Sequence, residues 1–141
     1  MTTPHDLLEL VLNRLSALPS VTLYVGHVPD TVPVIPGTVP AQIKPYVVVW
    51  PGETRDPRDI DLAQEGPGYA WTAYITVAAR NAGEVMSVAH QVRSKIHRSN
   101  GPGGSRFTHI DTGAVARMDP DPSVKPSRAF LAMEFGVQSA Y

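Results

Sequence analysis

The sequence predicts an α+β fold, in which a mostly antiparallel β-sheet carries two α-helices packed on one face and long Pro-rich loops join the elements. Apolar residues recur with helical spacing in two segments, 3–18 and 81–101. Other segments are rich in the β-branched and aromatic residues that favour strands, namely 21–25, 46–50, 69–80, 107–118 and 127–141. The 14 prolines and 11 glycines cluster between these segments. A length of 141 residues fits a single domain, 1–141.

The first helix is predicted from its cap and its apolar stripe. Thr3 can cap the helix, Pro4 fits its first turn, and Asp6 stands three residues after the cap. Pro19 is expected to end the helix. The residues between follow the spacing of an amphipathic helix, with apolar side chains at Leu7, Leu8, Val11, Leu15 and Leu18.

A Pro-rich arm, residues 26–45, follows the short strand predicted at 21–25. A central strand cannot run through its prolines, which lack a backbone donor and stand at Pro29, Pro33, Pro36, Pro40 and Pro45. We expect the arm to lie on the domain surface or to reach a neighbouring molecule, with its Val and Ile residues covering something apolar. The next strand, 46–50, reads Tyr-Val-Val-Val-Trp and is predicted to be buried on both faces or to lie at a well-covered position.

Residues 51–68 are predicted to form a long charged loop. Loops longer than about 12–15 residues usually bind something or move. The acids of this loop do not have the spacing of a calcium-binding loop. Because Arg55 and Arg58 alternate with the acids, the charges nearly balance, which favours a solvated or interface loop over a metal site.

The segment 69–80 alternates as a half-buried strand and leads directly into the second helix. One face would carry Tyr69, Trp71, Ala73, Ile75, Val77 and Ala79, and the other Thr72, Tyr74, Thr76 and Arg80. Asn81 is a predicted cap with Glu84 three residues later, and Asn100-Gly101 is expected to close the helix. The last two strands, around Asp-Pro-Asp-Pro, are predicted to pair antiparallel.

Composition excludes several classes of function. The formal net charge of −1 and the lack of Lys or Arg runs give no electrostatic reason to bind nucleic acid or an anionic membrane. Without cysteine there are no disulfides, thiolate chemistry or Cys-ligated metals. The N-terminal stretch does not have the pattern of a signal peptide, and no segment reaches the roughly 20 apolar residues of a membrane helix. We therefore expect a soluble protein made inside the cell, with no membrane partner.

No group of residues has the spacing of a catalytic or metal site. His90 and His97 are seven apart on the second helix and are interpreted as part of a solvated face, while His109 with Asp111 is a two-residue coincidence. There is no G-x-S-x-G elbow, and the run Gly-Pro-Gly-Gly at 101–104 follows a helix instead of opening one. The sequence thus predicts a protein that is not an enzyme and has no cofactor or metal.

The order of parts resembles the tail terminator (tail completion, minor tail) proteins of long-tailed bacteriophages. An N-terminal helix is followed by "LYVGHVPDTVP", "PYVVVW", a charged loop, a long strand and "NAGEVMSVAHQVRSKIH", over residues 3–140. The Pro-rich insert at 29–45 and the Gly-Pro-Gly-Gly turn depart from the family pattern.

The resemblance implies a structural virion protein at the head–tail junction, made in the host cytoplasm. Such proteins form a ring, commonly a homohexamer, that caps the tail tube, stops its polymerisation and offers a surface to the head connector or stopper protein. DNA would pass through the lumen without specific binding, which suits a near-neutral chain. Stiff proline-rich arms also suit a ring subunit, because they lose less entropy on docking.

The arm and the charged loop are the candidate interface. The residues assigned to it are Pro33, Pro36, Arg55, Asp56, Arg58 and Asp59; for the four charged ones, a solvated role fits equally well. Two alternatives remain open at this point. The chain could be a head-side connector or stopper, which shares the small α+β ring-subunit plan. It could also be a small ligand-binding or hydrolytic domain with its long loops as lids.

Overall fold

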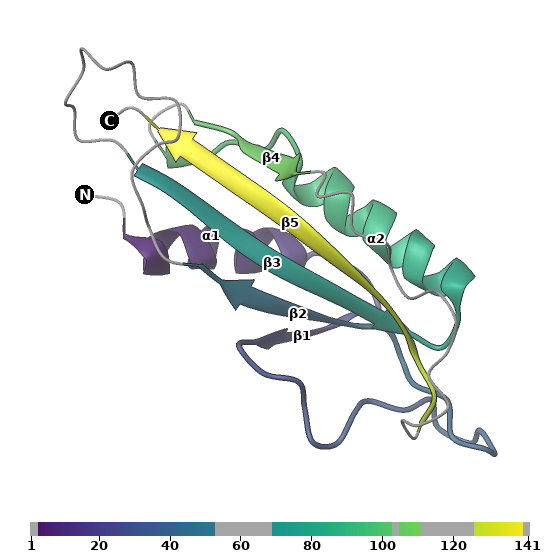
Figure 1. Cartoon of the computed structure of the whole chain (residues 1–141). Helices are drawn as coiled ribbons and strands as arrows, with labels where there is room; N and C mark the ends of the chain where they lie inside the picture. The colour runs from purple at the N-terminus through teal and green to yellow at the C-terminus, as the bar shows by residue number, and fades with distance from the viewer. Residues whose placement is uncertain (1–2, 53–68, 103–104, 111–125, 140–141) are drawn as a thin grey trace, which may run out of the picture.

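The structure is a computed structural model that describes residues 3–52, 69–102, 105–110 and 126–139 (Figure 1). Along these residues the elements are α1 (Pro4–Leu15), β1 (Thr22–Val25), β2 (Tyr46–Pro51), β3 (Tyr69–Ala79), α2 (Ala82–Ile96), β4 (Phe107–Ile110) and β5 (Ala129–Ser139). The predicted α+β class is confirmed.

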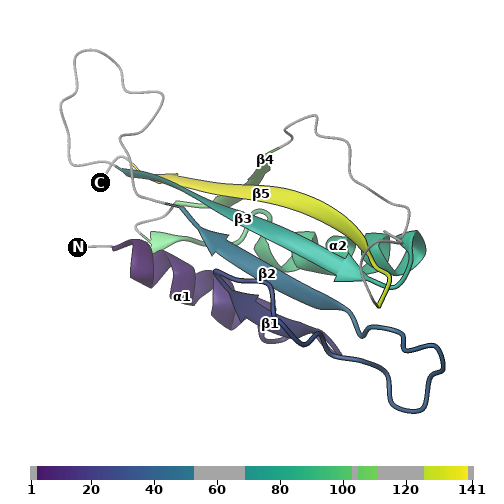
Figure 2. The ribbon, with the colours of Figure 1, turned by 60° about the horizontal axis from the view of Figure 1, so that its bottom comes forward.

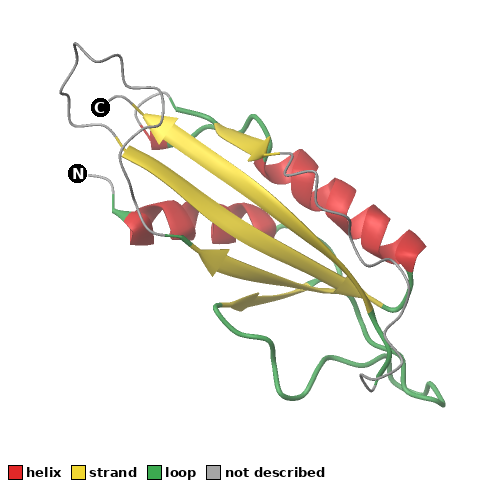
Figure 3. Ribbon diagram, in the orientation of Figure 1, coloured by secondary structure: helices red, strands yellow, loops and turns green. Residues whose placement is uncertain are grey.

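The strands form one sheet in the order β1-β2-β3-β5-β4. The pairings β2–β3, β3–β5 and β4–β5 are antiparallel, and the last of these was expected from the sequence. β1 pairs with β2 in parallel. Because a parallel pair cannot be joined by a tight hairpin, the chain needs a long connection here, and residues 26–45 supply it. Figure 3 shows this arm as the long loop between β1 and β2.

Helix α1 begins with the capping box that the sequence predicts. The Asp6 N–H donates to Thr3 Oγ1 at 3.2 Å, and the Thr3 N–H donates to Asp6 Oδ2 at 2.8 Å. The helix ends at Leu15, before Pro19, but Leu18 in the following turn is still buried. The apolar stripe thus continues past the last helical residue.

Helix α2 begins as predicted and ends earlier than predicted. The Glu84 N–H donates to Asn81 Oδ1 at 2.9 Å. The expected end at Asn100-Gly101 is wrong, because the helix stops at Ile96 with His97 as its C-cap. Arg98 takes a positive φ of 63°, and the chain turns to run beside β4. Hydrogen bonds to β4 therefore replace the last helical turn.

Both helices pack on one face of the sheet, which we call the inner face (Figure 2). Its cluster combines the stripes of α1 and α2 with apolar residues of β2 to β5. Four of its largest side chains, all almost fully buried, are Leu7, Trp71, Phe107 and Phe135. The predicted alternation of β3 is confirmed for the side chains described, since Trp71, Ala73, Ile75, Val77 and Ala79 all belong to this cluster.

The opposite face of the sheet, which we call the outer face, has a smaller second cluster. It consists of Val32 and Ile43 from the arm together with Tyr46, Val48 and Ala78 from β2 and β3. The buried strand predicted at 46–50 is confirmed, since Tyr46, Val47, Val48 and Val49 are buried and alternate between the two clusters. Apolar cover on both sides explains the continuous apolar run of β2.

Candidate interaction surfaces

The arm is a folded element anchored on the outer face. Ile43 is fully buried and Val32 is nearly so, both against Tyr46 and Val48 of β2. A hydrogen bond also ties the arm to the sheet: Arg80 Nη1 donates to Gln42 Oε1 at 3.1 Å. As expected from the sequence, the arm therefore covers an apolar surface with its Val and Ile residues.

The outer part of the arm, residues 33–44, is a hairpin that projects beyond the ends of the strands (Figure 2). The Ile35 N–H donates to the Gln42 carbonyl at 2.8 Å, and the Lys44 N–H donates to the Pro33 carbonyl at 2.9 Å. Thr38 Oγ1 donates to the Ile35 carbonyl at 2.9 Å and accepts from the Gln42 N–H. These bonds hold the tip in a defined shape.

The hairpin exposes apolar side chains. Val39 is 97% exposed and Val34 is 42% exposed. Of the two prolines assigned to an interface, Pro33 is half-buried at the base of the hairpin and Pro36 is exposed at its tip. Because Val39 is almost fully exposed, the tip is a candidate contact surface.

A buried cation lies beside the arm. Arg128 is 6% exposed, and its guanidinium lies 6.0 Å from the centroid of the Tyr46 ring. Its Nη1 donates to Tyr46 Oη at 3.0 Å and its Nε donates to the Pro126 carbonyl at 3.2 Å. These contacts hold Tyr46 in place beneath the arm.

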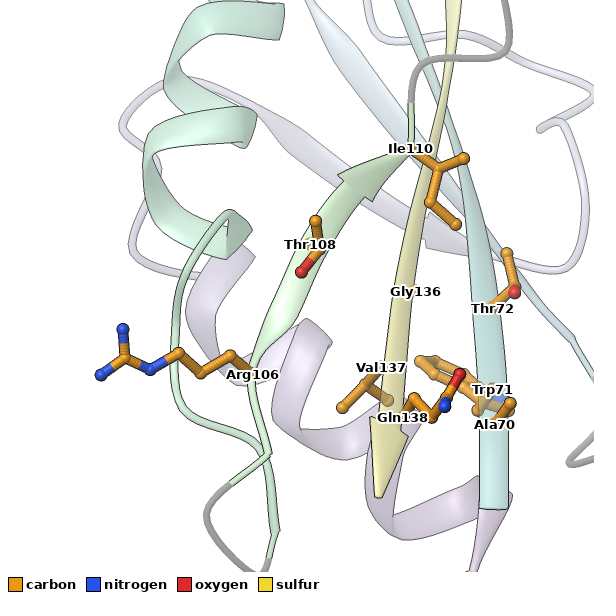
Figure 4. A pocket seen from close by; sticks show the side chains of 9 residues that line it. All are labelled: Ala70, Trp71, Thr72, Arg106, Thr108, Ile110, Gly136, Val137 and Gln138. Carbon is orange, nitrogen blue, oxygen red and sulfur yellow. The ribbon is translucent and has the colours of Figure 1, made fainter. Parts of the chain in front are cut away.

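The far end of the outer face contains a groove across β3, β5 and β4 (Figure 4). Its volume is about 340 Å³, and its lining includes Ala70, Thr72, Thr108, Ile110, Gly136 and Gln138. Gly136 forms the floor, and a Cβ added there would stand 2.9 Å from Ile110 Cδ1. The Arg106 side chain, although part of the rim, extends away from β5 (Figure 4). The hollow therefore exists because the middle strand has no side chain at this position.

Tyr74 lies on the outer face between the groove and the part that the arm covers. It lies on the outer side of β3 between Trp50 of β2 and Glu134 of β5, and 47% of it is exposed. Trp50 is fixed beside it, because its Nε1 donates to Thr76 Oγ1 at 3.1 Å. Thr72 and Thr76, which the sequence predicts on the same strand face as Tyr74, lie with it on one side of β3, and Thr72 is buried there.

The two edges of the sheet differ. At the β4 edge, the Phe107 N–H donates to the Ser99 carbonyl at 2.9 Å and the Arg98 N–H donates to the Phe107 carbonyl at 2.7 Å. The His109 N–H donates to His97 Nδ1 at 2.9 Å. The segment after α2 thus occupies this edge.

The β1 edge has no such cover within the described residues. Thr22 and Gly26 direct their N–H groups to β2, at 3.3 Å from the Pro45 carbonyl and 2.9 Å from the Val49 carbonyl. Because successive residues of a strand alternate, Leu23 and Val25 direct theirs outward. Gly26 ends the strand after four residues with a φ of 70°. A short edge strand of this kind limits pairing with other chains.

The histidines do not form the helix face that the sequence predicts. His90 is exposed on α2, whereas His97 lies beyond the end of that helix and accepts from the His109 backbone. Burial lowers the pKa of His97 below its ordinary value of 6.5, and the charges of Arg93, Arg98 and His109 lower it further. A neutral imidazole suits its role as an acceptor at the sheet edge.

Four of the assigned interface residues, Arg55, Asp56, Arg58 and Asp59, lie outside the described residues. Within the described ranges, no three His, Asp or Glu side chains gather as metal ligands would. In the same ranges, no helix is long and apolar enough to cross a membrane.

No model of a known protein family matches the chain, and no curated protein sequence matches it.

Three features of these surfaces were not foreseen from sequence. They are the folded tip of the arm, the groove above Gly136 and the buried Arg128. A proline run signals a broken strand but not a hairpin, and a groove depends on side chains from three strands that are far apart in the chain. Only the tip had a possible signal, since residues 31–43 carry no charge.

Proposed function

We propose that this chain is the subunit of a tail terminator, a homo-oligomeric ring that caps a phage tail tube, stops its polymerisation and offers a surface for joining the head. The single observation that carries the proposal is the arm. It is a hairpin with an uncharged tip and two apolar anchors, Val32 and Ile43, which hold it at a fixed place on the sheet.

A fixed arm supports a ring because ring closure depends on angle. Identical subunits in head-to-tail contact close into a ring only if each contact repeats the same rotation. A loosely attached arm would allow many rotations. An arm that is hydrogen-bonded and packed in place keeps the angle constant and loses little entropy on docking. The order of sequence parts, which resembles that of tail terminators, supports the same proposal.

The charge and the site chemistry are consistent with a structural role. A formal net charge of −1 suits the wall of a channel through which DNA moves without sticking. We assign no catalytic residue, cofactor or metal to the chain. Its partners in the proposal are other copies of itself, the tail tube protein and the head connector or stopper protein.

Native mass spectrometry of the purified chain over a wide concentration range tests the proposal. We expect one closed species of a defined subunit number, with six as the specific expectation. A monomer at every concentration would reject a self-sufficient ring. Binding assays then place the ring, since a tail terminator captures assembled tail tube, whereas capture of the head connector alone would indicate a head-side neck protein.

A further inference from the structure

We infer that a pocket at the root of the arm, which we call the root pocket, binds the phosphate group of a small organic molecule. The root pocket has a volume of about 460 Å³. Its lining comes from the arm, the segment that leads into β1, the residue after β3 and the first turn of α2. The inference goes beyond the proposed ring and does not depend on it.

The sheet brings two cations together at this pocket. Tyr46 of β2 is paired with Ala78 of β3. Lys44 and Arg80 each stand two residues beyond that pair, so the pairing carries both to the same end of the sheet. Both of them line the root pocket. Two residues that are 36 positions apart in the sequence thus contribute to one site.

The guanidinium of Arg80 is held from two sides. Its Nε donates to Glu84 Oε2 at 2.6 Å, and its Nη1 donates to Gln42 Oε1 at 3.1 Å. Among the described residues, Arg80 Nη2 and the Lys44 ammonium have no hydrogen-bond partner. A cation that is already fixed loses little entropy when it binds an anion.

Positive charge is in excess around the pocket. Its lining has two cations, Lys44 and Arg80, and one carboxylate, Glu84, which is already paired with Arg80. A third cation, Arg128, directly precedes β5 where that strand is paired with the end of β3, and it is only 6% exposed. Within the described ranges, no carboxylate forms an ion pair with Arg128. An anion in the pocket would therefore be attracted by a net positive charge.

The polar groups of the lining favour a phosphate over a carboxylate. Ser20 and Thr22 add hydroxyl groups to the two cations, so potential donors come from the arm, from β3 and from the start of β1. A phosphate group presents three strong acceptor oxygens and carries up to two charges. A carboxylate has only two oxygens, which lie in one plane with its carbon. Donors placed around a pocket on three segments can be used more fully by the phosphate.

The remaining wall of the pocket is apolar, which indicates a small organic phosphate. Val21, Ile35 and Pro45 complete the lining. Pockets that bind small molecules have volumes of about 300–1,000 Å³ and combine apolar walls with a few polar groups. A nucleic acid is not favoured, because the chain has a formal net charge of −1 and no run of Lys or Arg to follow a phosphodiester backbone.

A ligand in this pocket would tie the arm to the sheet. Ile35, Lys44 and Pro45 belong to the arm, whereas Arg80 follows β3. A ligand that contacts both sides would reinforce the hydrogen bond between Gln42 and Arg80. Because a ligand stabilises the conformation to which it binds, the arm should open less often when the pocket is occupied.

Isothermal titration calorimetry with phenyl phosphate tests the inference, and benzoate at the same ionic strength is the carboxylate comparison. We expect one saturable site per chain that prefers phenyl phosphate. Lys44→Gln should weaken this binding about tenfold or more, because it removes a charge that meets the phosphate. Lys44 is exposed, so the fold should be retained. Lys95→Gln is the matched control, since Lys95 is exposed on α2 outside the pocket and its loss should leave the affinity unchanged.

A second variant tests the charge argument in the opposite direction. Glu84→Gln removes a negative charge and keeps an oxygen that can accept from Arg80 Nε. It should tighten the binding of phenyl phosphate about threefold. Weaker binding by this variant would contradict the charge argument.

Limited proteolysis with an enzyme of broad specificity gives a readout at the arm itself. Saturating phenyl phosphate should slow cleavage within 26–45 in the natural chain and have no such effect in the Lys44→Gln variant. Equal protection of both chains would place the bound phosphate elsewhere and overturn the inference.

The remaining outcomes are equally decisive. The lack of a saturable isotherm up to about 10 mM phenyl phosphate would overturn the inference, and so would an equal loss of affinity in K44Q and K95Q. Benzoate that binds as tightly as phenyl phosphate would overturn the assignment to a phosphate. None of these results changes the ring proposal, which native mass spectrometry tests by itself.

Discussion

The inner and outer faces of the sheet are covered in different ways. On the inner face, two amphipathic helices cover strand residues from β2 to β5 and leave a continuous buried cluster. On the outer face, within the described part of the chain, the arm covers the end that includes Tyr46 and Ala78, and Tyr74 and the groove lie further along the strands. Among the described residues, the inner face therefore accounts for most of the buried apolar surface, while the outer face is divided between the part beneath the anchored arm and the part that contains Tyr74 and the groove.

The difference shows how a small subunit can separate folding from assembly. The helix layer buries apolar side chains that recur with helical spacing along each helix. An arm with two anchor residues, Val32 and Ile43, adds little burial but fixes a projection in place. Substitutions on the inner face should therefore lower the stability of the whole domain, whereas substitutions at the arm should have smaller and more local effects.

The largest effect is expected on the inner face. Phe135→Ala removes a fully buried ring from the centre of the cluster and should lower the free energy of unfolding by about 3–5 kcal/mol. Urea denaturation followed by circular dichroism measures this loss. A loss below 1 kcal/mol would mean that the helix layer is not the main source of stability.

A smaller and more local effect is expected at the anchor of the arm. Ile43→Ala should cost about 2–3 kcal/mol, the lower part of the range for this change, because the arm can settle onto Tyr46. Limited proteolysis should show faster cleavage within 26–45 while the sheet stays intact. Val39→Ala in the same arm is the control and should change stability by less than about 0.5 kcal/mol. Equal proteolysis of both variants would contradict the anchor role of Ile43.

The third prediction concerns pH at the closed β4 edge. Because the folded state lowers the pKa of His97, the unfolded chain binds its proton more readily, so stability is complete above pH 6.5 and falls as the pH drops below that value. Thermal unfolding at pH 7.5 and pH 5.5 measures the fall. His97→Asn keeps an acceptor for the His109 N–H without titrating, and should flatten this part of the pH profile. His90→Asn is the control, and an equal flattening by it would refute the assignment to His97.

The smallest effect is expected in the open part of the outer face. Tyr74→Ala removes a side chain that is 47% exposed, and should change the free energy of unfolding by less than about 1 kcal/mol. The same denaturation experiment applies. A loss as large as that of Phe135→Ala would mean that the outer face contributes to folding as the inner face does.

Local chemistry was enough to predict most of the elements. The Thr3–Asp6 box and the Asn81 cap fix the starts of both helices because each involves residues only three apart. The alternation of β3 predicted which side chains face the helices, since the pleat has a period of two. The end of α2 was predicted wrongly because a partner outside the helix, Phe107, bonds the backbone of Arg98 and Ser99.

The candidate surfaces were less predictable because they depend on register. The proline positions indicated an arm, but not that Ile35 and Gln42 bond across a hairpin. Gly136 lines a groove only because Thr72 and Thr108 are its partners on the two flanking strands. Such pairings join residues far apart in the chain, so they cannot be predicted from a local sequence pattern.

The positions of the two tryptophans have a consequence for spectroscopy. Trp71 is 1% exposed in the inner cluster and its indole Nε1 donates to the Gly52 carbonyl at 2.7 Å, whereas Trp50 packs on the second cluster beside the arm. Each face of the sheet therefore carries its own fluorophore. The tryptophan emission of a Trp71→Phe chain reports the outer face through Trp50, and that of a Trp50→Phe chain reports the helix-covered core through Trp71. Intrinsic fluorescence can thus follow changes on the outer face and changes in the inner core as separate signals, without any attached dye.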